Sequence, residues 1–233
     1  LIIPFLIPFL FIMAIGPKLK WIKSNLENKI YLIFLLIISI LLSYLIVKNF
    51  DYNFLINTIL ISSAFYLFFV NLRDFFTKKP KNISQNISHF GFSLLILSIL
   101  FNNLFSTEVI TNLKVGETFE NSKTKIVFEN INQKIENNYK SIVGNFSIKS
   151  SNEKMENFFP ELRIYNQPNI VTSEADIKTT LISDKFIVIN LVQNQDYFNV
   201  RYQVKPFMLW IWISVLIISF GGLISFIKKK YEK

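Results

Sequence analysis

The sequence predicts an integral membrane protein that is mainly α-helical and carries one β-rich domain on the outer face, inserted before the last helix. Three observations predict this fold class. Hydrophobic residues make up 51% of the chain, several apolar runs are about 20 residues long, and one long polar block has an ordinary soluble composition. Only 18% of the residues are charged, against about a quarter in soluble globular proteins. We therefore exclude a soluble single-domain enzyme.

Five apolar segments are candidates for helices that cross a hydrocarbon core about 30 Å thick. They are residues 1–17, 30–48, 54–72, 87–105 and 206–227. The chain begins at Leu1, and its first segment lacks the basic residues that open a signal peptide. We therefore expect a spanning helix cut at its start, in a fragment of a longer protein. The sequence predicts about five transmembrane helices.

The polar block, residues 106–205, changes from helical periodicity to the two-residue period of strands. Phe198, Val200, Tyr202 and Val204 alternate with polar residues, which predicts a strand with one buried face. The apolar run within Lys185–Val192 predicts a strand that is buried on both faces. Further short strands are expected at Lys123–Ile131, Ile142–Lys149 and Glu161–Tyr165. The sequence thus predicts a small barrel or sandwich at 106–205, between four helices (1–105) and a last helix with a basic tail (206–233).

Basic residues predict how the chain is oriented in the membrane. They gather in the 18–29 loop, the 73–86 loop and the tail after residue 227, whereas the short 48–53 connection holds only Lys48. By the positive-inside rule, the three basic segments face the cytoplasm and the β-rich block lies on the outer side. We interpret the net charge of +9 as a topology signal and a contact with anionic lipid, not as a nucleic-acid patch.

His89, the single histidine, is the main candidate for chemistry. It lies in Ser88-His89-Phe90-Gly91, close to the cytoplasmic end of the fourth predicted helix. An ionisable side chain in a spanning segment suggests a function, and imidazole is a good axial ligand for haem iron. Gly91 would remove bulk that obstructs a macrocycle. The alternative is a hydrated residue at a helix end. Because the chain has one histidine and no cysteine, it predicts neither a multi-histidine zinc site nor thiol exchange of its own.

Other residues have structural interpretations. Trp210 and Trp212, at the start of the last helix, are expected to be anchors at the membrane interface. Glu161 and Arg163 have the i, i+2 spacing that puts two strand residues on one face, where they can pair. Gly221-Gly222 is expected at a close helix–helix contact. Four asparagines in or near the spans are expected to be hydrogen-bonding glue or helix caps: Asn57, Asn71, Asn102 and Asn103.

Five short motifs occur in order along the chain. They are Gly16-Pro17-Lys18-Leu19-Lys20-Trp21, Ser88-His89-Phe90-Gly91, Pro160-Glu161-Leu162-Arg163-Ile164-Tyr165, Thr172-Ser173-Glu174-Ala175-Asp176-Ile177-Lys178-Thr179, and Arg201-Tyr202 with Lys205-Pro206-Phe207 before Trp210-Ile211-Trp212 and Gly221-Gly222. In this order, they resemble the C-terminal half of the CcmF family, the membrane haem lyase subunit of cytochrome c maturation. The resemblance covers nearly the whole chain.

The resemblance implies that His89 is one axial ligand of a haem b held within the membrane. The second ligand is expected from the N-terminal half of the family, which this sequence lacks. The implied chemistry is thioether formation between haem vinyl groups and the thiols of a CxxCH motif in an apocytochrome. The resemblance assigns no catalytic residue to this chain, which it makes one part of a haem lyase (a holocytochrome c synthase). Glu161 and Arg163 would hold the outer domain together.

The resemblance also implies partners and a location. The expected partners are the N-terminal half, the haem chaperone CcmE, CcmH/CcmI-type subunits, apocytochrome c and the lipid bilayer, with no nucleic acid. The expected location is the bacterial inner membrane, with a periplasmic β domain; the mitochondrial inner membrane is the alternative. Two alternative functions remain at this point, a non-catalytic docking or scaffold subunit and a transporter component. A paralogue from nitrite reductase maturation would have almost the same sequence features.

Overall fold

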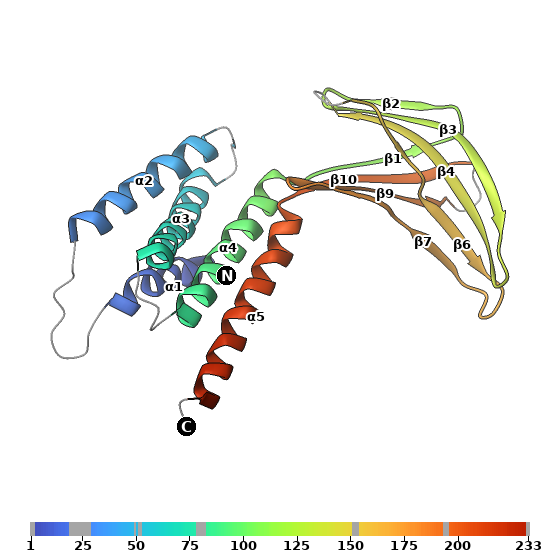
Figure 1. The fold of residues 1–233 in the computed structure, drawn as a ribbon. Helices are drawn as coiled ribbons and strands as arrows, with labels where there is room; N and C mark the ends of the chain where they lie inside the picture. The colour runs from blue at the N-terminus through green and yellow to red at the C-terminus, as the bar shows by residue number, and fades with distance from the viewer. Residues whose placement is uncertain are drawn as a thin grey trace. The chain divides into compact units, whose positions relative to one another are not determined.

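The chain divides into two compact units, one helical and one made of strands. The computed structural model describes residues 3–18, 29–48, 50, 53–77, 83–150, 154–192 and 196–231. Residues Leu1–Leu104 and Trp210–Lys233 form the first unit, called the helical unit below, and Phe105–Leu209 form the second, called the β unit. Figure 1 shows the helices of one unit and the strands of the other.

Five α-helices and one short 3-10 helix are described. They are α1 (Ile3–Ile15), η1 (Gly16–Lys18), α2 (Lys29–Val47), α3 (Phe54–Thr77), α4 (Ile83–Phe105) and α5 (Met208–Tyr231). Within the described residues, α2, α3, α4 and α5 are long and apolar enough to cross a membrane. The described part of α1 has 13 residues, which at about 1.5 Å per residue spans about 20 Å. The four long helices match four of the predicted spans, and α1 lies in the first predicted segment, where the sequence predicts a spanning helix cut at its start.

Helix α4 begins earlier than predicted, at Ile83 instead of residue 87. Polar side chains at Ser84, Gln85 and Asn86 make this turn look like a loop in the sequence. In the structure, Asn86 is buried and its side-chain nitrogen donates to the backbone oxygen of Asp74 in α3, at 3.3 Å. A buried hydrogen bond compensates the cost of removing the amide from water, so this polar turn can be helical.

The core of the helical unit is formed by α1, α2, α3 and α4. Leu10, Leu35, Leu67 and Leu97, one from each helix, belong to one cluster of buried residues. Many large apolar side chains remain exposed on the outer faces of these helices, among them Phe34 at 56%. Such exposure is expected where lipid, rather than water, surrounds a helix.

The β unit is a sandwich of two antiparallel sheets. The strands are β1 (Thr107–Leu113), β2 (Thr118–Glu120), β3 (Thr124–Ile135), β4 (Tyr139–Ser150), β5 (Glu156–Phe158), β6 (Glu161–Tyr165), β7 (Val171–Glu174), β8 (Asp176–Thr179), β9 (Ser183–Leu191) and β10 (Phe198–Pro206). One sheet has the order β1-β10-β9-β8; the other has the order β2-β3-β4-β6-β7, with β5 paired to β4. Phe128 and Phe146 of one sheet share a buried cluster with Ile189 and Val200 of the other. Both sheets thus face a common apolar core.

The strand predictions are partly confirmed. The predicted buried face of β10 is present, because Val200 and Tyr202 are buried and Phe198 and Val204 pack against the core. The prediction that Lys185–Val192 is buried on both faces is wrong. In β9, Lys185, Ile187 and Ile189 are buried, and the two residues between them are half-buried. Among the described residues of the β unit, no helix covers the other face of this sheet, so the sheet has one core face.

Candidate functional site

His89 lies in the second turn of α4 and is half-buried. The side-chain nitrogen of Asn71, which is itself only 5% exposed, donates to the backbone oxygen of His89 at 3.2 Å. This bond ties α3 to α4 at the position of the histidine. It confirms the prediction that Asn71 serves as hydrogen-bonding glue between helices.

Contacts on either side of His89 fix the rotation of α4 against α3. The ring of Phe90 lies 5.8 Å from the ring of Phe68 and 5.4 Å from that of Phe75, centroid to centroid. Phe92 and Ile96, three and seven residues after His89, pack against the core of the helical unit. Residues at these spacings share a helix face, so His89 lies on the face of α4 that turns toward the helical core.

Gly91 faces a different neighbour. A Cβ atom at Gly91 would lie 2.9 Å from side-chain carbons of both Ile217 and Ile218 in α5. At about 100° per residue, positions 89 and 91 point about 200° apart around the helix. The expectation that Gly91 leaves room for a macrocycle beside His89 is therefore not supported by the geometry. Its small size allows α4 and α5 to approach closely.

Gly221 of α5 completes the same helix contact. A Cβ atom there would lie 2.8 Å from the backbone nitrogen of Ser88 and 2.9 Å from the backbone oxygen of Ser84. The Ser88 hydroxyl donates to the backbone oxygen of Ile218 at 3.4 Å. The predicted close contact at Gly221 is confirmed, whereas Gly222 has no atom within 4 Å of such a Cβ.

An apolar groove of about 650 Å³ in the helical unit is lined by residues of α3, α4 and α5. Phe75, Ile87 and Phe90 line it together with α5 residues such as Leu216 and Phe220. Its lining residues, as described, do not include His89. Ile87 and Phe90, on either side of His89 in the sequence, therefore contribute apolar surface to this groove.

His89 offers one imidazole, a residue type that can serve as a ligand of haem iron. Among the described residues, no group of three or more histidine, aspartate or glutamate side chains could hold a metal ion. A half-buried imidazole on a core-facing helix surface fits a single ligand to a planar group. A six-coordinate iron would need its second strong ligand from outside these residues.

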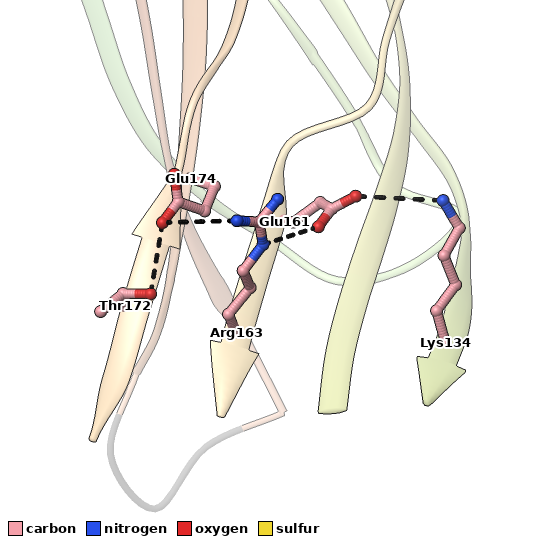
Figure 2. A network of polar contacts seen from close by, with 5 residues as sticks. All are labelled: Lys134, Glu161, Arg163, Thr172 and Glu174. Carbon is pink, nitrogen blue, oxygen red and sulfur yellow. Dashed lines mark hydrogen bonds and ion pairs between the residues drawn. The ribbon is translucent and has the colours of Figure 1, made fainter. Parts of the chain in front are cut away.

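In the β unit, Arg163 is the centre of a polar network (Figure 2). Its Nε donates to Glu161 Oε2 at 3.1 Å, and its Nη1 lies 4.0 Å from Glu174 Oε1. Glu161 also lies 3.9 Å from Lys134 Nζ, and the Thr172 hydroxyl donates to Glu174 at 3.4 Å. The hydrogen bond to Glu161, with a second to Tyr165, raises the pKa of the Arg163 guanidinium. The predicted pairing of Glu161 with Arg163 is confirmed, and the network links β3, β6 and β7.

Two further ion pairs were not predicted from the sequence. Lys185 of β9, whose side chain is 7% exposed, lies 2.8 Å from Glu156 of β5 and thereby joins the two sheets. Glu108 of β1 accepts hydrogen bonds from Gln203 and Arg201 of β10. These bonds, first from Gln203 and then from Arg201, lower the pKa of the Glu108 carboxyl. For the bonds between Glu108 and the two β10 residues, the sequence signal is the polar face of the strand predicted at 198–205.

Trp210 and Trp212 lie in the first two turns of α5, with 37% and 62% of their surfaces exposed. Partial exposure beside an apolar span is compatible with anchoring at the membrane interface. The basic residues that predict the orientation lie mostly outside the described residues, in 19–28, 78–82 and 232–233, or have undescribed side chains.

Comparisons with known proteins point to one family. A family model described as the CcmF C-terminal beta-sandwich matches residues 104–206. Cytochrome c-type biogenesis protein CcmF of Escherichia coli (strain K12) is 21% identical over 98% of this chain and 37% of its own length. Cytochrome c-type biogenesis protein ccl1 of Rhodobacter capsulatus is 27% identical over 62% of this chain and 22% of its own length.

A solved structure titled Cytochrome c Heme Lyase CcmF has a similar fold. It superposes with a TM-score of 0.70 at 16% sequence identity, over 95% of this chain and 38% of that chain. The sequence therefore spans little more than a third of the length of the E. coli relative and of the solved chain.

Proposed function

Because this chain belongs to the CcmF family and matches its C-terminal part, we propose that it forms the C-terminal half of a membrane haem lyase in cytochrome c maturation. In the proposed reaction, haem vinyl groups form thioether bonds with the two thiols of a CxxCH motif in an apocytochrome. Both thiols belong to the substrate, so the reaction is compatible with a chain that has no cysteine.

The observation that carries the proposal is the placement of His89 on the core-facing side of a membrane-spanning helix. Its imidazole would help to hold a haem b as one ligand of the iron, and the N-terminal half would supply a second ligand. Such a haem, when bound, supplies a one-electron redox centre that can keep the incoming haem iron ferrous.

The residues around His89 would act as positioning groups. Asn71 holds the α4 backbone at the histidine through its 3.2 Å bond, and Asn86 holds the preceding turn against α3. Phe90 adds ring contacts with α3 next to the ligand. Fixing the helix at three successive points would keep the imidazole in one orientation, which a rigid axial ligand needs.

We assign the β unit a docking role. It would present a folded surface on the periplasmic side to the haem chaperone CcmE, to CcmH/CcmI-type subunits and to apocytochrome c. The Arg163 network would hold neighbouring strands of that surface in register. The four long spans make the chain a multi-pass membrane protein, and the basic segments favour the bacterial inner membrane with the β unit outside.

A docking or scaffold subunit without haem is the second candidate. It is favoured by the α4–α5 contact, which explains Gly91 through helix packing alone. A transporter component is less compatible with the described spans, which run as continuous helices, whereas many secondary transporters use broken ones.

Haem content separates these candidates. We would purify the chain alone and co-expressed with the N-terminal part of the same protein, and compare the absorption of the reduced samples. The lyase proposal predicts little haem in the first sample and a sharp low-spin haem b spectrum in the second. A co-purified pair without haem would leave the docking subunit as the better interpretation.

A further inference from the structure

The turn between β8 and β9 has an unusual apolar tip. It consists of Thr180, Leu181 and Ile182, and the two aliphatic side chains are 71% and 70% exposed. Hairpin connections usually contain glycine, asparagine, aspartate or serine, as in the 136–138 connection of this chain, Glu-Asn-Asn. Two adjacent branched side chains at a turn tip are costly in water. Their exposure therefore suggests contact with something other than water.

The same turn lies beside the start of a membrane helix. The backbone nitrogen of Phe207 donates to the backbone oxygen of Ile182 at 2.7 Å, and Ser183 pairs with Pro206 across β9 and β10. The apolar span of α5 begins at Met208, the residue after Phe207. The tip of the turn is thus directly bonded to the chain one residue before that span.

The backbone of the turn is also suited to an apolar surrounding. The nitrogens of Ile182 and Ser183 donate to the hydroxyl oxygen of Thr180, at 3.3 and 3.0 Å. The nitrogen of Thr180 donates to the oxygen of Ser183 at 3.0 Å, and the oxygen of Ile182 accepts from Phe207. A backbone that satisfies its own polar groups enters a lipid environment without the cost of unmade hydrogen bonds.

We propose that the β8–β9 turn inserts into the headgroup boundary of the bilayer beside the start of α5, with Leu181 and Ile182 in contact with lipid. The occupant is lipid rather than a protein, because the exposed tip adjoins a segment that is itself long and apolar enough to span the membrane. The β unit would then be held at the membrane by this turn as well as by its two chain connections. The proposal does not depend on haem or on the direction of the topology.

Site-specific fluorescence tests this directly. The chain has no cysteine, so Leu181→Cys and, separately, Ile182→Cys create single labelling sites in the full chain. Each variant would carry an environment-sensitive fluorophore and be reconstituted in vesicles of phosphatidylcholine and phosphatidylglycerol. The matched control is Ile135→Cys, because Ile135 is 79% exposed but lies in β3 of the other sheet.

We expect a nitroxide near the top of the lipid acyl chain to quench the probes at 181 and 182 several-fold more strongly than the probe at 135. Aqueous iodide should show the reverse order. Equal iodide quenching at all three positions, without lipid quenching, would overturn the proposal. Protection of 181 and 182 from both quenchers would also overturn it, because a protein would then cover the turn.

Discussion

Gly91 of α4 lies so close to Ile218 of α5 that a Cβ atom at position 91 would come within 3.0 Å of the Ile218 backbone nitrogen. Gly221 makes the reciprocal approach from α5, toward the backbone of Ser88. Small residues allow membrane helices to approach closely, and van der Waals packing between them is a main source of their association. The α4–α5 contact therefore depends on two glycines, one on each helix.

Gly91→Ala should separate α4 from α5. The added methyl group meets backbone as well as side-chain atoms, so we expect a loss of about 1–3 kcal/mol. Thermal unfolding of the purified protein in detergent measures the effect. Gly222→Ala is the matched control, because that position has open space around it. Equal melting temperatures for the two variants would contradict the packing role of Gly91.

Glu108→Gln should change how the pairing of β1 with β10 responds to acid. The pKa of the Glu108 carboxyl is lowered in the folded protein, so its charged form stabilises the fold above the pKa of an unfolded glutamate. That contribution is lost as the pH falls through the lowered folded pKa. After correction for the intrinsic exchange rate at each pH, the variant should show lower amide protection in Thr107–Leu113 at neutral pH and a smaller loss of protection on acidification.

Hydrogen exchange followed by mass spectrometry measures this difference against pH. Glu136→Gln provides the control, since it removes the same charge from a connection in the other sheet. If the two variants gave the same exchange profile for β1, the hydrogen bonds from Gln203 and Arg201 would not contribute to the stability of this edge.

Replacing both Trp210 and Trp212 by Phe should leave cytochrome maturation largely intact. An interfacial anchor needs a large ring at the membrane boundary, and Phe retains an aromatic ring there although it is smaller than indole and has no N–H. Holocytochrome yield and protein abundance would be measured together. Near-total loss of holocytochrome at normal protein abundance would mean that the indoles contact haem or a partner instead.

The orientation is testable with single cysteines at Asn138, in the β unit, and at Lys229, in the basic tail. The positive-inside rule predicts that an impermeant thiol reagent labels position 138, and not 229, in intact cells. Labelling of both after permeabilisation is the control for reactivity. Labelling of position 229 alone in intact cells would reverse the topology.

Long periodic segments were the part of the fold that the sequence predicted well. The alternation of Phe198, Val200, Tyr202 and Val204 identifies β10 and its core face, and the later helices follow from apolar length alone. Strands β2, β5, β7 and β8 were not predicted, because three or four residues are too few to show a two-residue period. Strand β1 was not predicted either, because apolar residues lie on both of its faces, with Ile110 59% exposed. Ile177 of β8 is exposed as well, at 57%.

In the candidate site too, contacts between residues close in the sequence could be predicted, whereas contacts between distant residues could not. The pairing of Glu161 with Arg163 follows from spacing within one strand, and it is present. The ion pair between Glu156 and Lys185 joins residues far apart in the sequence, so no local pattern reveals it. Gly91 was assigned to the surroundings of His89 by proximity in sequence, whereas the helix turns it toward α5.

The proposed binding of haem iron by His89 is tested by the absorption spectrum of the co-expressed halves with His89→Ala. We expect this change to remove the haem or make it high-spin at normal protein abundance, and His89→Met to retain haem at a raised potential. Gln85→Ala, at an exposed position one turn earlier in α4, should keep the low-spin spectrum of bis-imidazole type. An unchanged low-spin spectrum in the His89→Ala pair would contradict the ligand assignment.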